Sequence, residues 1–257
     1  MRITSEGIVL RRTKIANGRR IILLLTYNLG KISAGTNLNE RNNTRSSAAL
    51  RPFAYGTYQL FQGRNYYNLD RADTLRTFYG IGENPDKFLY ASTALELTEK
   101  IIPQEVPQPA IFNALIDFLR SIEKANENEL TILLAYEVKL LRITGLSPGT
   151  DVCAECGKTE KLNSFSVPAG GMICSECMDK IQGYETVKRV HDSLIYRPEF
   201  DIISILKYFE TKPISAFESI VLNPRIAAEL RKILKQYFLY HFDLGELKSE
   251  KLFLTDL

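Results

Sequence analysis

Four cysteines are the residues whose type and spacing most clearly specify chemistry. They form two Cys-x-x-Cys pairs separated by 17 residues, Cys153 with Cys156 and Cys174 with Cys177. Each pair presents two thiolates on a tight turn, and the intervening loop lets both pairs close on one ion, as tetrahedral zinc requires. The alternatives are two disulfides, which a reducing cytosol disfavours, and a thioredoxin-like redox pair, which does not explain two copies. The spacing therefore predicts one zinc ion per chain.

The predicted zinc site is structural rather than catalytic. Four thiolates fill the tetrahedron and leave no position for an activated water. Residues 151–180 carry three lysines and five acidic residues, so this stretch is negative even before the thiolates are counted. A negative module is a poor contact for phosphates. We therefore expect a zinc-finger loop, spanning 149–180, that orders this part of the chain against the helices.

Opposite charges are concentrated in different parts of the sequence. The whole chain has 33 Lys and Arg against 30 Asp and Glu, a net charge of +3. Residues 1–80 hold thirteen of these cations and four of the acids, a net charge of +9, which leaves −6 for the other 177 residues. Such asymmetry indicates that one part of the chain binds a polyanion.

The N-terminal cations are grouped around a hairpin turn predicted at Asn17-Gly18. Five of them lie at one end of this hairpin: Arg11, Arg12, Lys14, Arg19 and Arg20. Three more extend the group along the following connection: Arg41, Arg45 and Arg51. Cations beside aromatic rings are typical of single-strand binders, and five tyrosines are candidate rings: Tyr27, Tyr55, Tyr58, Tyr66 and Tyr67. A solvated basic face and tyrosines that pack in a core or rim are the alternatives. Because the charge is concentrated, we favour nucleic-acid binding.

No motif of a catalytic or nucleotide-binding site occurs. The sequence lacks a P-loop, a complete dinucleotide-binding glycine motif, HExxH and GxSxG. Its two histidines, His191 and His241, are not placed with a nucleophile. The longest purely aliphatic run, 21–25, is far too short to cross a bilayer or to act as a signal peptide. We therefore expect a cytoplasmic protein that is not an enzyme, with no small-molecule substrate and no membrane contact.

The elements that must position these residues are of two kinds. Alternating patterns and turn signals predict five short antiparallel strands: 3–15, 19–27, 31–38, 53–61 and 66–70. Five such strands match a small closed barrel, with the OB-fold as the leading candidate, although periodicity alone does not distinguish an SH3-like barrel. After Gly82 the period changes to about 3.6, and helices are predicted over 85–102, 109–122, 130–144, 198–210 and 223–242, with a loop at 146–183. We expect an α+β protein: a five-stranded OB-fold β-barrel in 1–80, then an all-helical domain in 81–257 that contains the zinc loop.

Several stretches resemble the RecO family of bacterial recombination mediators. In the N-terminal third they are residues 7–11, 26–34 and 50–53. In the remainder they are residues 136–142, 145–148, 153–157 and 245–249, with Leu252. The resemblance spans nearly the whole chain, and the order and spacing of the stretches carry it.

The resemblance implies a non-enzymatic protein of bacterial homologous-recombination repair, cytoplasmic and associated with the nucleoid. Such proteins bind single- and double-stranded DNA, anneal complementary strands and contact the acidic C-terminal tail of single-stranded DNA-binding protein. Together with RecR they help RecA to displace that protein. The family's basic DNA surface corresponds here to Arg11, Arg12, Lys14, Arg19 and Arg20. Some relatives lack the zinc cysteines, which agrees with a structural metal.

This sequence departs from the family pattern in one connection. Many relatives carry a Lys/Arg-rich loop after the third strand, whereas residues 37–47 here hold only Arg41 and Arg45 together with Glu40. The departure implies a smaller DNA footprint. Two other functions fit the same residues: an RNA- or ribosome-associated zinc protein, and a scaffold whose basic patch receives an acidic peptide without binding nucleic acid.

Overall fold

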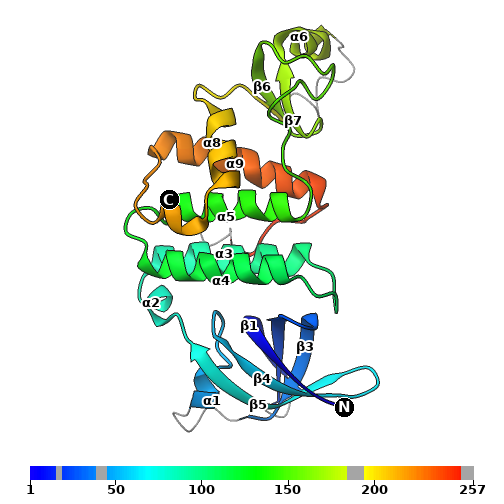
Figure 1. Cartoon of the computed structure of the whole chain (residues 1–257), viewed down its shortest axis with the longest axis vertical. Coiled ribbons are helices and arrows are strands. Elements are labelled where there is room, and N and C mark those ends of the chain that lie inside the picture. The colour runs from blue at the N-terminus through cyan, green and yellow to red at the C-terminus, as the bar shows by residue number, and fades with distance from the viewer. Residues whose placement is uncertain (16–18, 39–44, 184–193, 250–257) are drawn as a thin grey trace. The chain divides into compact units, whose positions relative to one another are not determined.

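The computed structural model describes residues 1–15, 19–38, 45–183 and 194–249 of the chain (Figure 1). Contacts within it define two compact units. The first consists of residues 1–129 together with the C-terminal segment that begins at Leu247. The second consists of residues 130–246. Each unit is described separately below.

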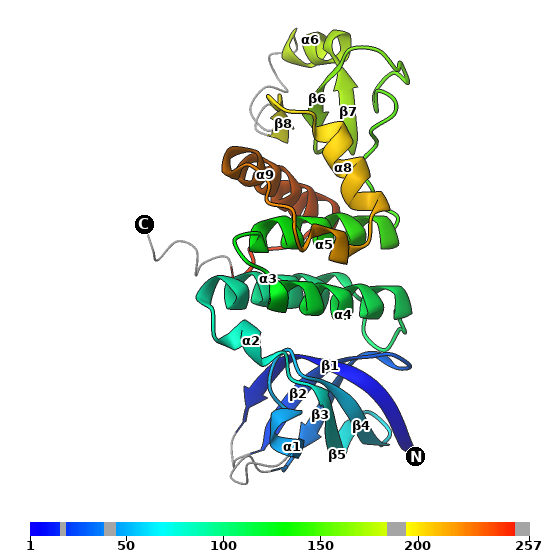
Figure 2. The ribbon, with the colours of Figure 1, turned by 60° about the vertical axis from the view of Figure 1, so that its left-hand side comes forward.

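Five strands form a closed barrel in the first unit (Figure 2). They are β1 (Arg2–Lys14), β2 (Arg20–Thr26), β3 (Gly30–Thr36), β4 (Tyr55–Gln62) and β5 (Tyr67–Arg76). The first half of β1 pairs with β4 and its second half pairs with β2. A short parallel pairing of β3 with β5 completes the ring in the order β1-β2-β3-β5-β4. This connectivity is that of an OB-fold, so the leading fold prediction is confirmed.

Alternating side chains of these strands fill the barrel. Directly opposed residues on neighbouring strands point to the same face, so buried residues from several strands meet inside. The interior is built mainly from nine residues: Val9, Ile22, Leu24, Ile32, Ala34, Tyr58, Leu60, Leu69 and Ala72. The alternation predicted for 53–61 is confirmed, because Tyr58 and Leu60 are fully buried whereas Gln59 and Phe61 are exposed.

A β-bulge in β1 changes which of its side chains face the interior. Val9 pairs with Leu24, but Arg11 pairs with the next residue, Leu23, so one extra residue of β1 lies between the two pairs. After this shift Arg12, and not Arg11, is on the side of the strand that faces inward. The outer surface of the barrel receives Arg11 instead.

Helices complete the first unit. They are α1 (Arg45–Ala48), α2 (Tyr79–Gly82), α3 (Pro85–Ile101) and α4 (Pro109–Lys124). The start of α3 is as predicted, because the Asn84 side chain accepts a hydrogen bond from the N–H of Lys87 at 3.0 Å and Pro85 takes the first helical position. An edge-to-face contact between Phe53 and Phe88, with centroids 5.6 Å apart, packs α3 against the barrel.

The loop between α3 and α4 extends the contact with β3. The N–H of Glu105 donates to the carbonyl of Lys31 at 3.0 Å. Gly30 has φ +72°, and a Cβ there would lie 2.2 Å from the carbonyl oxygen of Val106, so only glycine fits this close approach. The ammonium of Lys31 donates to the carbonyl of Glu99 near the end of α3, where the helix dipole favours a cation.

The C-terminal segment also belongs to the first unit. The N–H groups of Lys248 and Ser249 both donate to the carboxylate of Glu96 on α3, each at 2.8 Å. Burial raises the pKa of Glu96, but these hydrogen bonds outweigh burial, so its pKa is lowered. The preceding Leu247 is buried. Residues from both ends of the described chain therefore form this unit.

Helices make up most of the second unit. They are α5 (Glu129–Ile143), α8 (Ile202–Thr211), the short 3₁₀-helix η3 (Ile214–Phe217) and α9 (Pro224–His241). α5 is buried over most of its length, as its sequence predicts. Its fully buried Glu137 forms an ion pair with Arg231 of α9, and Lys139 donates to the carbonyl of Glu210 on α8 at 2.6 Å. Polar contacts as well as apolar packing thus join these helices.

Residues 146–183, expected to be a loop, instead contain regular structure. The elements are β6 (Leu162–Ser166), β7 (Gly171–Cys174) and α6 (Ser175–Gly183), and β8 (Ile195–Tyr196) pairs with β6 to complete a three-stranded sheet. Strands this short show too little alternation to be recognised from sequence. The turn between β6 and β7 contacts α9: the hydroxyl of Tyr237 donates to the Gly170 carbonyl at 3.3 Å, and His241 Nε2 lies 2.8 Å from the Val167 carbonyl.

Packing groups α2, α3 and α4 with the barrel, although the sequence assigns them to the second predicted domain. A compact unit and an independently folding domain are different properties, and the division into 1–80 and 81–257 stays a prediction.

Across the described residues, no helix is both long and apolar enough to span a membrane.

Candidate metal centre and candidate nucleic-acid interface

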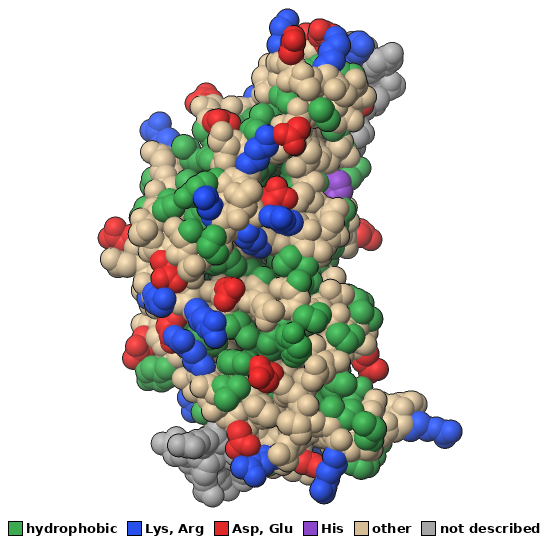
Figure 3. Space-filling view, in the orientation of Figure 1, with side chains coloured by type: hydrophobic (Ala, Val, Ile, Leu, Met, Phe, Trp, Pro, Cys, Tyr) green, Lys and Arg blue, Asp and Glu red, His purple; other side chains and the backbone are tan. Residues whose placement is uncertain are grey.

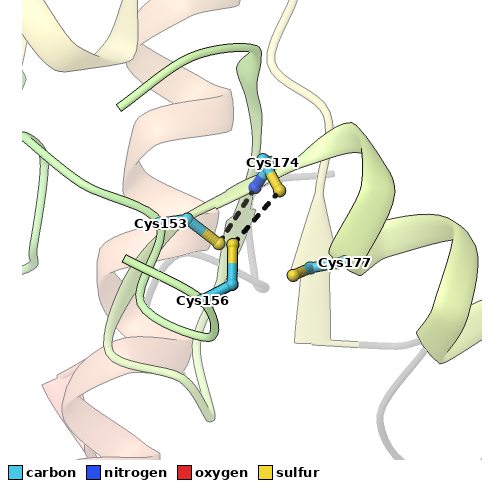
Figure 4. Close-up of side chains that lie close together, drawn as sticks. All are labelled: Cys153, Cys156, Cys174 and Cys177. Atoms are coloured by element: carbon cyan, nitrogen blue, oxygen red, sulfur yellow. Dashed lines mark hydrogen bonds between the residues drawn. The ribbon is translucent and has the colours of Figure 1, made fainter. Parts of the chain in front are cut away.

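The four cysteines lie together in the second unit (Figure 4). Their Sγ atoms are all within 4.8 Å of one another, and those of Cys156 and Cys174 are 3.7 Å apart. A disulfide needs an S–S distance of about 2 Å, so these are free thiols. In Figure 4 the side chains converge from two knuckles on a common point. The arrangement is suited to holding one metal ion.

Local backbone structure holds each knuckle in place. The N–H of Cys153 donates to the carbonyl of Lys158 at 2.7 Å, and the N–H of Gly157 returns to the carbonyl of Cys153 at 2.8 Å. Gly157 has φ +75°, which glycine adopts without strain. Cys174 ends β7, and Cys177 lies in the first turn of α6. A strand end and a helix start therefore present the second pair.

The thiols differ in how readily they ionise. Burial raises the pKa of Cys153, but hydrogen bonds from the backbone of Cys174, Cys156 and Glu155 outweigh burial and lower its pKa to about 6. Burial, followed by interaction with the other three thiols, raises the pKa of Cys177 to about 12. Four thiolates this close together repel one another, so a bound cation is needed to ionise the whole set.

An exposed ion pair lies beside the cysteines. The Nζ atom of Lys158 is 2.6 Å from a carboxylate oxygen of Glu176 on α6. The pair raises the pKa of Lys158 and lowers the pKa of Glu176. It connects the first knuckle to α6, so this lysine already has a partner of opposite charge.

Four of the predicted DNA-binding residues gather at one end of the barrel. Lys14 lies directly opposite Arg20 in the β1–β2 pairing, and Arg12 is two residues before Lys14, so the three share one side of the hairpin. Burial, and then repulsion by Arg20 and Arg51, lower the pKa of Arg12. Arg51 is therefore close to the same group. We call Arg12, Lys14, Arg20 and Arg51 the mouth cluster.

Two further hairpin cations lie apart from the mouth cluster. Arg11 is on the outer surface, where its Nη2 is 2.9 Å and its Nε 3.2 Å from Oε1 of Glu99 on α3. This carboxylate already partners its charge. Arg19 lies over the outer face of β3, with Nη2 3.7 Å from the position that a Cβ on Gly35 would take. The structure therefore places Arg11 and Arg19 on the outer surface, although Arg11 and Arg12 both border one hollow of about 520 Å³ beside α3.

The remaining predicted contacts are less closely placed. Arg45 is the first residue of α1. Arg41 and the predicted turn at Asn17-Gly18 lie outside the described residues.

The five candidate tyrosines have different surroundings. Tyr58 and Tyr67 are part of the barrel core. Tyr27 and Tyr55 pack edge-on against a phenylalanine of α4, with ring centroids 5.5 and 6.3 Å apart. Tyr66 differs, because 54% of it is exposed. Tyr27 also stays 41% exposed despite its contact with α4, so packing alone accounts for three of the five rings.

Sequence reasoning missed Lys31 and Glu99, which join the barrel to α3. Glu99 is one of several acidic residues on that helix, and nothing in the sequence marks it as the partner of Arg11. Lys31 follows a turn and resembles any strand cation. Only the packing of α3 against the barrel reveals their roles.

Fold and site together define the class of protein. It is an α+β protein with an N-terminal OB-fold barrel and a four-cysteine cluster suited to a metal ion. Among the residues that the structure describes, no other group of His, Cys, Asp and Glu has this geometry.

Comparisons with known proteins cover the same two parts. The family model "Recombination protein O N terminal" matches residues 1–78, and "Recombination protein O C terminal" matches residues 82–195. The DNA repair protein RecO of Alkaliphilus metalliredigens is 31% identical over 245 residues, which are 95% of each chain. The protein of the same name from Bacillus pumilus is 30% identical over 251 residues, 98% of this chain and 93% of that one. That of a Thermoanaerobacter species is 28% identical over 248 residues, 96% and 95% of the two chains.

The chain belongs to the RecO family of DNA repair and recombination proteins. The resemblance stated from its sequence is confirmed.

Proposed function

We propose that this protein is a non-enzymatic recombination mediator. It binds single- and double-stranded DNA through its barrel and anneals complementary strands. With RecR, it assists the loading of RecA on strands coated by single-stranded DNA-binding protein. It contacts the C-terminal tail of that protein. The observation that carries the proposal is the mouth cluster at one end of an OB-fold barrel. Membership of the RecO family supports the setting and the partners, and a bacterial cytoplasm with an association to the nucleoid follows from it.

The physical argument rests on like charges held close together. Burial first, and then repulsion by Arg20 and Arg51, lower the pKa of Arg12, so both neighbours lie close enough to Arg12 to repel its charge. A phosphate backbone relieves this repulsion, and each phosphate contact releases condensed counterions. We assign the main contacts to the mouth cluster, with Arg19, Arg41 and Arg45 as further contacts. Arg11 contributes less because Glu99 already holds it.

For the metal centre we propose one structural zinc ion per chain, held by Cys153, Cys156, Cys174 and Cys177. Zinc–thiolate bonds of about 2.3 Å in a tetrahedron give S–S edges of about 3.8 Å. The 3.7 Å between Cys156 and Cys174 fits that edge, and four thiols leave no open position. Zinc would supply the positive charge that the thiolates require, and with it the order of the loop.

DNA binding is tested with a charge reversal in the full chain. We expect Arg12→Glu/Lys14→Glu/Arg20→Glu to weaken single-strand binding at least about 100-fold in 0.1 M salt, and to lower the slope of log affinity against log salt by about 2. Fluorescence anisotropy with a labelled oligonucleotide at several salt concentrations measures both. Annealing of complementary strands coated by single-stranded DNA-binding protein should fall in parallel.

The matched control reverses three exposed lysines of the second unit, Lys180, Lys212 and Lys232. It changes net charge equally, so an equal loss of affinity would attribute binding to charge alone. Unchanged affinity in the mouth variant would place the DNA site elsewhere. Equal binding of RNA without annealing would favour an RNA-associated protein, and peptide binding without nucleic-acid binding would favour a scaffold.

A further inference from the structure

A row of outward-facing side chains crosses the barrel beside the β4–β5 hairpin. Arg2 on β1 lies opposite Phe61 on β4, and Phe61 lies opposite Asn68 on β5. Asn68 in turn lies beside Gly35 on β3, and Gly35 opposite Ile21 on β2. Their neighbours along the strands face the core, so these side chains form one continuous strip on the outer surface. We call it the outer strip.

The middle of the outer strip is open. Gly35 has no side chain there, and the guanidinium of Arg19 lies beside it. A hollow of about 380 Å³ is bordered by Arg19, Gly35, Asn37, Asn68 and Asp70. The hollow is therefore lined by one cation, two amides and a single carboxylate.

Exposed rings and cations lie at the hairpin end of the strip. Phe61 is 38% exposed and Tyr66 is 54% exposed, although neither ring is needed to fill the barrel core. The ring of Tyr66 lies over Gly63, where a Cβ would be 2.4 Å from ring atoms, so the turn holds the ring flat against its backbone. Arg2 and Arg64 are exposed beside them. Figure 3 shows Lys or Arg side chains at the outer end of this hairpin, next to hydrophobic side chains of the barrel.

Arg2 is held only loosely. It forms one long ion pair, with 3.9 Å between its Nε and Oδ2 of Asp70, and its side chain is 89% exposed, so solvent screens this pair. Arg71 is different, because Asp73 holds it at 2.8 Å, and we leave it out of the site. Exposed rings between exposed arginines match single strands, because bases can lie on the rings only when they are unpaired, while phosphates meet the guanidinium groups.

We propose that the outer strip is a base-stacking platform for single-stranded DNA, with Phe61 and Tyr66 as the rings and Arg2, Arg19 and Arg64 as phosphate contacts. The inference rests on the proposed function and extends it, since the mouth cluster itself offers cations without exposed rings. Arg19 and Arg20 are consecutive residues that serve different surfaces. A strand held at the mouth cluster would therefore pass Arg19 and the Gly35 hollow before its bases reach Phe61.

The first test is spectroscopic and uses the full chain. The protein contains no tryptophan, so Phe61→Trp introduces a single indole. We expect its fluorescence to be quenched by an oligothymidine strand and not by a duplex of equal length. Tyr79→Trp, at an exposed position on α2 away from the strip, is the matched control and should not be quenched. Equal responses of the two variants would overturn the proposal.

The second test measures affinity. Phe61→Ala/Tyr66→Ala should weaken single-strand binding about tenfold or more, change duplex binding less than about twofold and leave the salt slope unchanged. Arg2→Gln/Arg64→Gln should lower the single-strand slope by about 1.4. Gly35→Leu should fill the hollow, where a Cβ would lie 3.3 Å from Asn68 Oδ1, and weaken single-strand binding.

The two tests separate the inference from the proposed function. If the ring variant binds single strands like wild type while the mouth variant loses binding, the platform is wrong and the proposed function stands. If wild-type protein binds no DNA, or if reversal of the mouth cluster changes nothing, the proposed function fails first.

Discussion

The mouth cluster and the cysteine cluster each bring together four groups that carry the same sign of charge when ionised, and the two clusters differ in burial. Three of the four cysteines are at most 7% exposed, whereas Lys14 and Arg51 of the mouth cluster are exposed. A buried group of thiolates needs its counter-ion permanently, as part of the fold. Cations that reach solvent, as Lys14 and Arg51 do, can exchange water for a ligand and return. The cysteine cluster is thus suited to a permanently bound structural metal ion, and the mouth cluster is suited to reversible binding of an anion.

The largest expected effect is on the cysteine side of this comparison. Cys153→Ser removes a nearly buried ligand, and structural zinc in small modules contributes roughly 10 kcal/mol or more of folding free energy. We expect zinc content to fall from about one per chain to near zero and the 149–180 loop to become protease-sensitive.

The same variant should keep its single-strand affinity, because the mouth cluster is in the other unit. Met178→Leu, a volume-conserving change beside the cysteines, is the control and should keep its zinc. A preparation of wild-type protein made under reducing conditions and free of zinc would contradict the assignment.

The next effect in size is on the mouth cluster. Arg12→Gln removes a cation that Arg20 and Arg51 repel, so the melting temperature should stay level or rise. Single-strand affinity should fall about fivefold in 0.1 M salt, the effect of one lost phosphate contact. Thermal unfolding and anisotropy on the same sample check both. A fall in melting temperature would show that Arg12 stabilises the folded barrel. The mouth cluster would then be part of the fold, as the cysteine cluster is, and the difference between the two clusters would disappear.

A smaller effect is expected at Arg11, which differs from Arg12 by one position. Because Glu99 partners its charge, Arg11→Gln should weaken DNA binding less than about twofold. Glu99→Gln should release Arg11 and raise the affinity slightly, with a steeper salt slope. Anisotropy titrations of the three single variants make the comparison, and equal losses for Arg11→Gln and Arg12→Gln would contradict the assignment of the two faces.

The smallest expected effect concerns a single partly buried charge, the carboxylate of Glu96. The pKa of Glu96 is lowered from its ordinary 4.5 by the N–H groups of Lys248 and Ser249. A lowered carboxyl pKa stabilises the folded form above 4.5, and that stability is lost as the pH falls through the folded pKa. The protection of the Lys248 and Ser249 N–H groups against hydrogen exchange, relative to the intrinsic rate at each pH, should therefore stay constant from pH 7 to 5 and fall only below. Glu96→Gln should lower this protection at every pH, and a fall already near pH 6 would contradict this.

The sequence predicted the positions of strands and helices better than the side of each strand on which a residue lies. Turn signals and alternation located the five strands, and proline and capping residues located the first long helices. The β-bulge after Val9 was not predictable, because it depends on how β1 bends between two partners. Without the bulge, alternation would have placed Arg11 on the inward side and Arg12 outside. One inserted residue therefore decides which arginine belongs to the mouth cluster.

Within the candidate sites, local chemistry was predictable and distant packing was not. The cysteine spacing was sufficient to predict the cluster, because each knuckle is a local turn. The surroundings of the tyrosines were not predictable, because Tyr27 and Tyr55 pack edge-on against Phe112 of α4, which is distant in the sequence. The hydrogen bonds of Glu96 with Lys248 and Ser249 span 152 and 153 residues, and no sequence pattern encodes them.

The attachment of Lys248 and Ser249 to Glu96 has a consequence for synthesis on the ribosome. The barrel and α3 emerge early, but the residues that satisfy the Glu96 carboxylate are translated only after the whole of 130–246. The nascent first unit therefore waits with this acceptor facing water while the second unit emerges and folds. The first unit is therefore completed only after residues 130–246 have been made, although most of it is made before them.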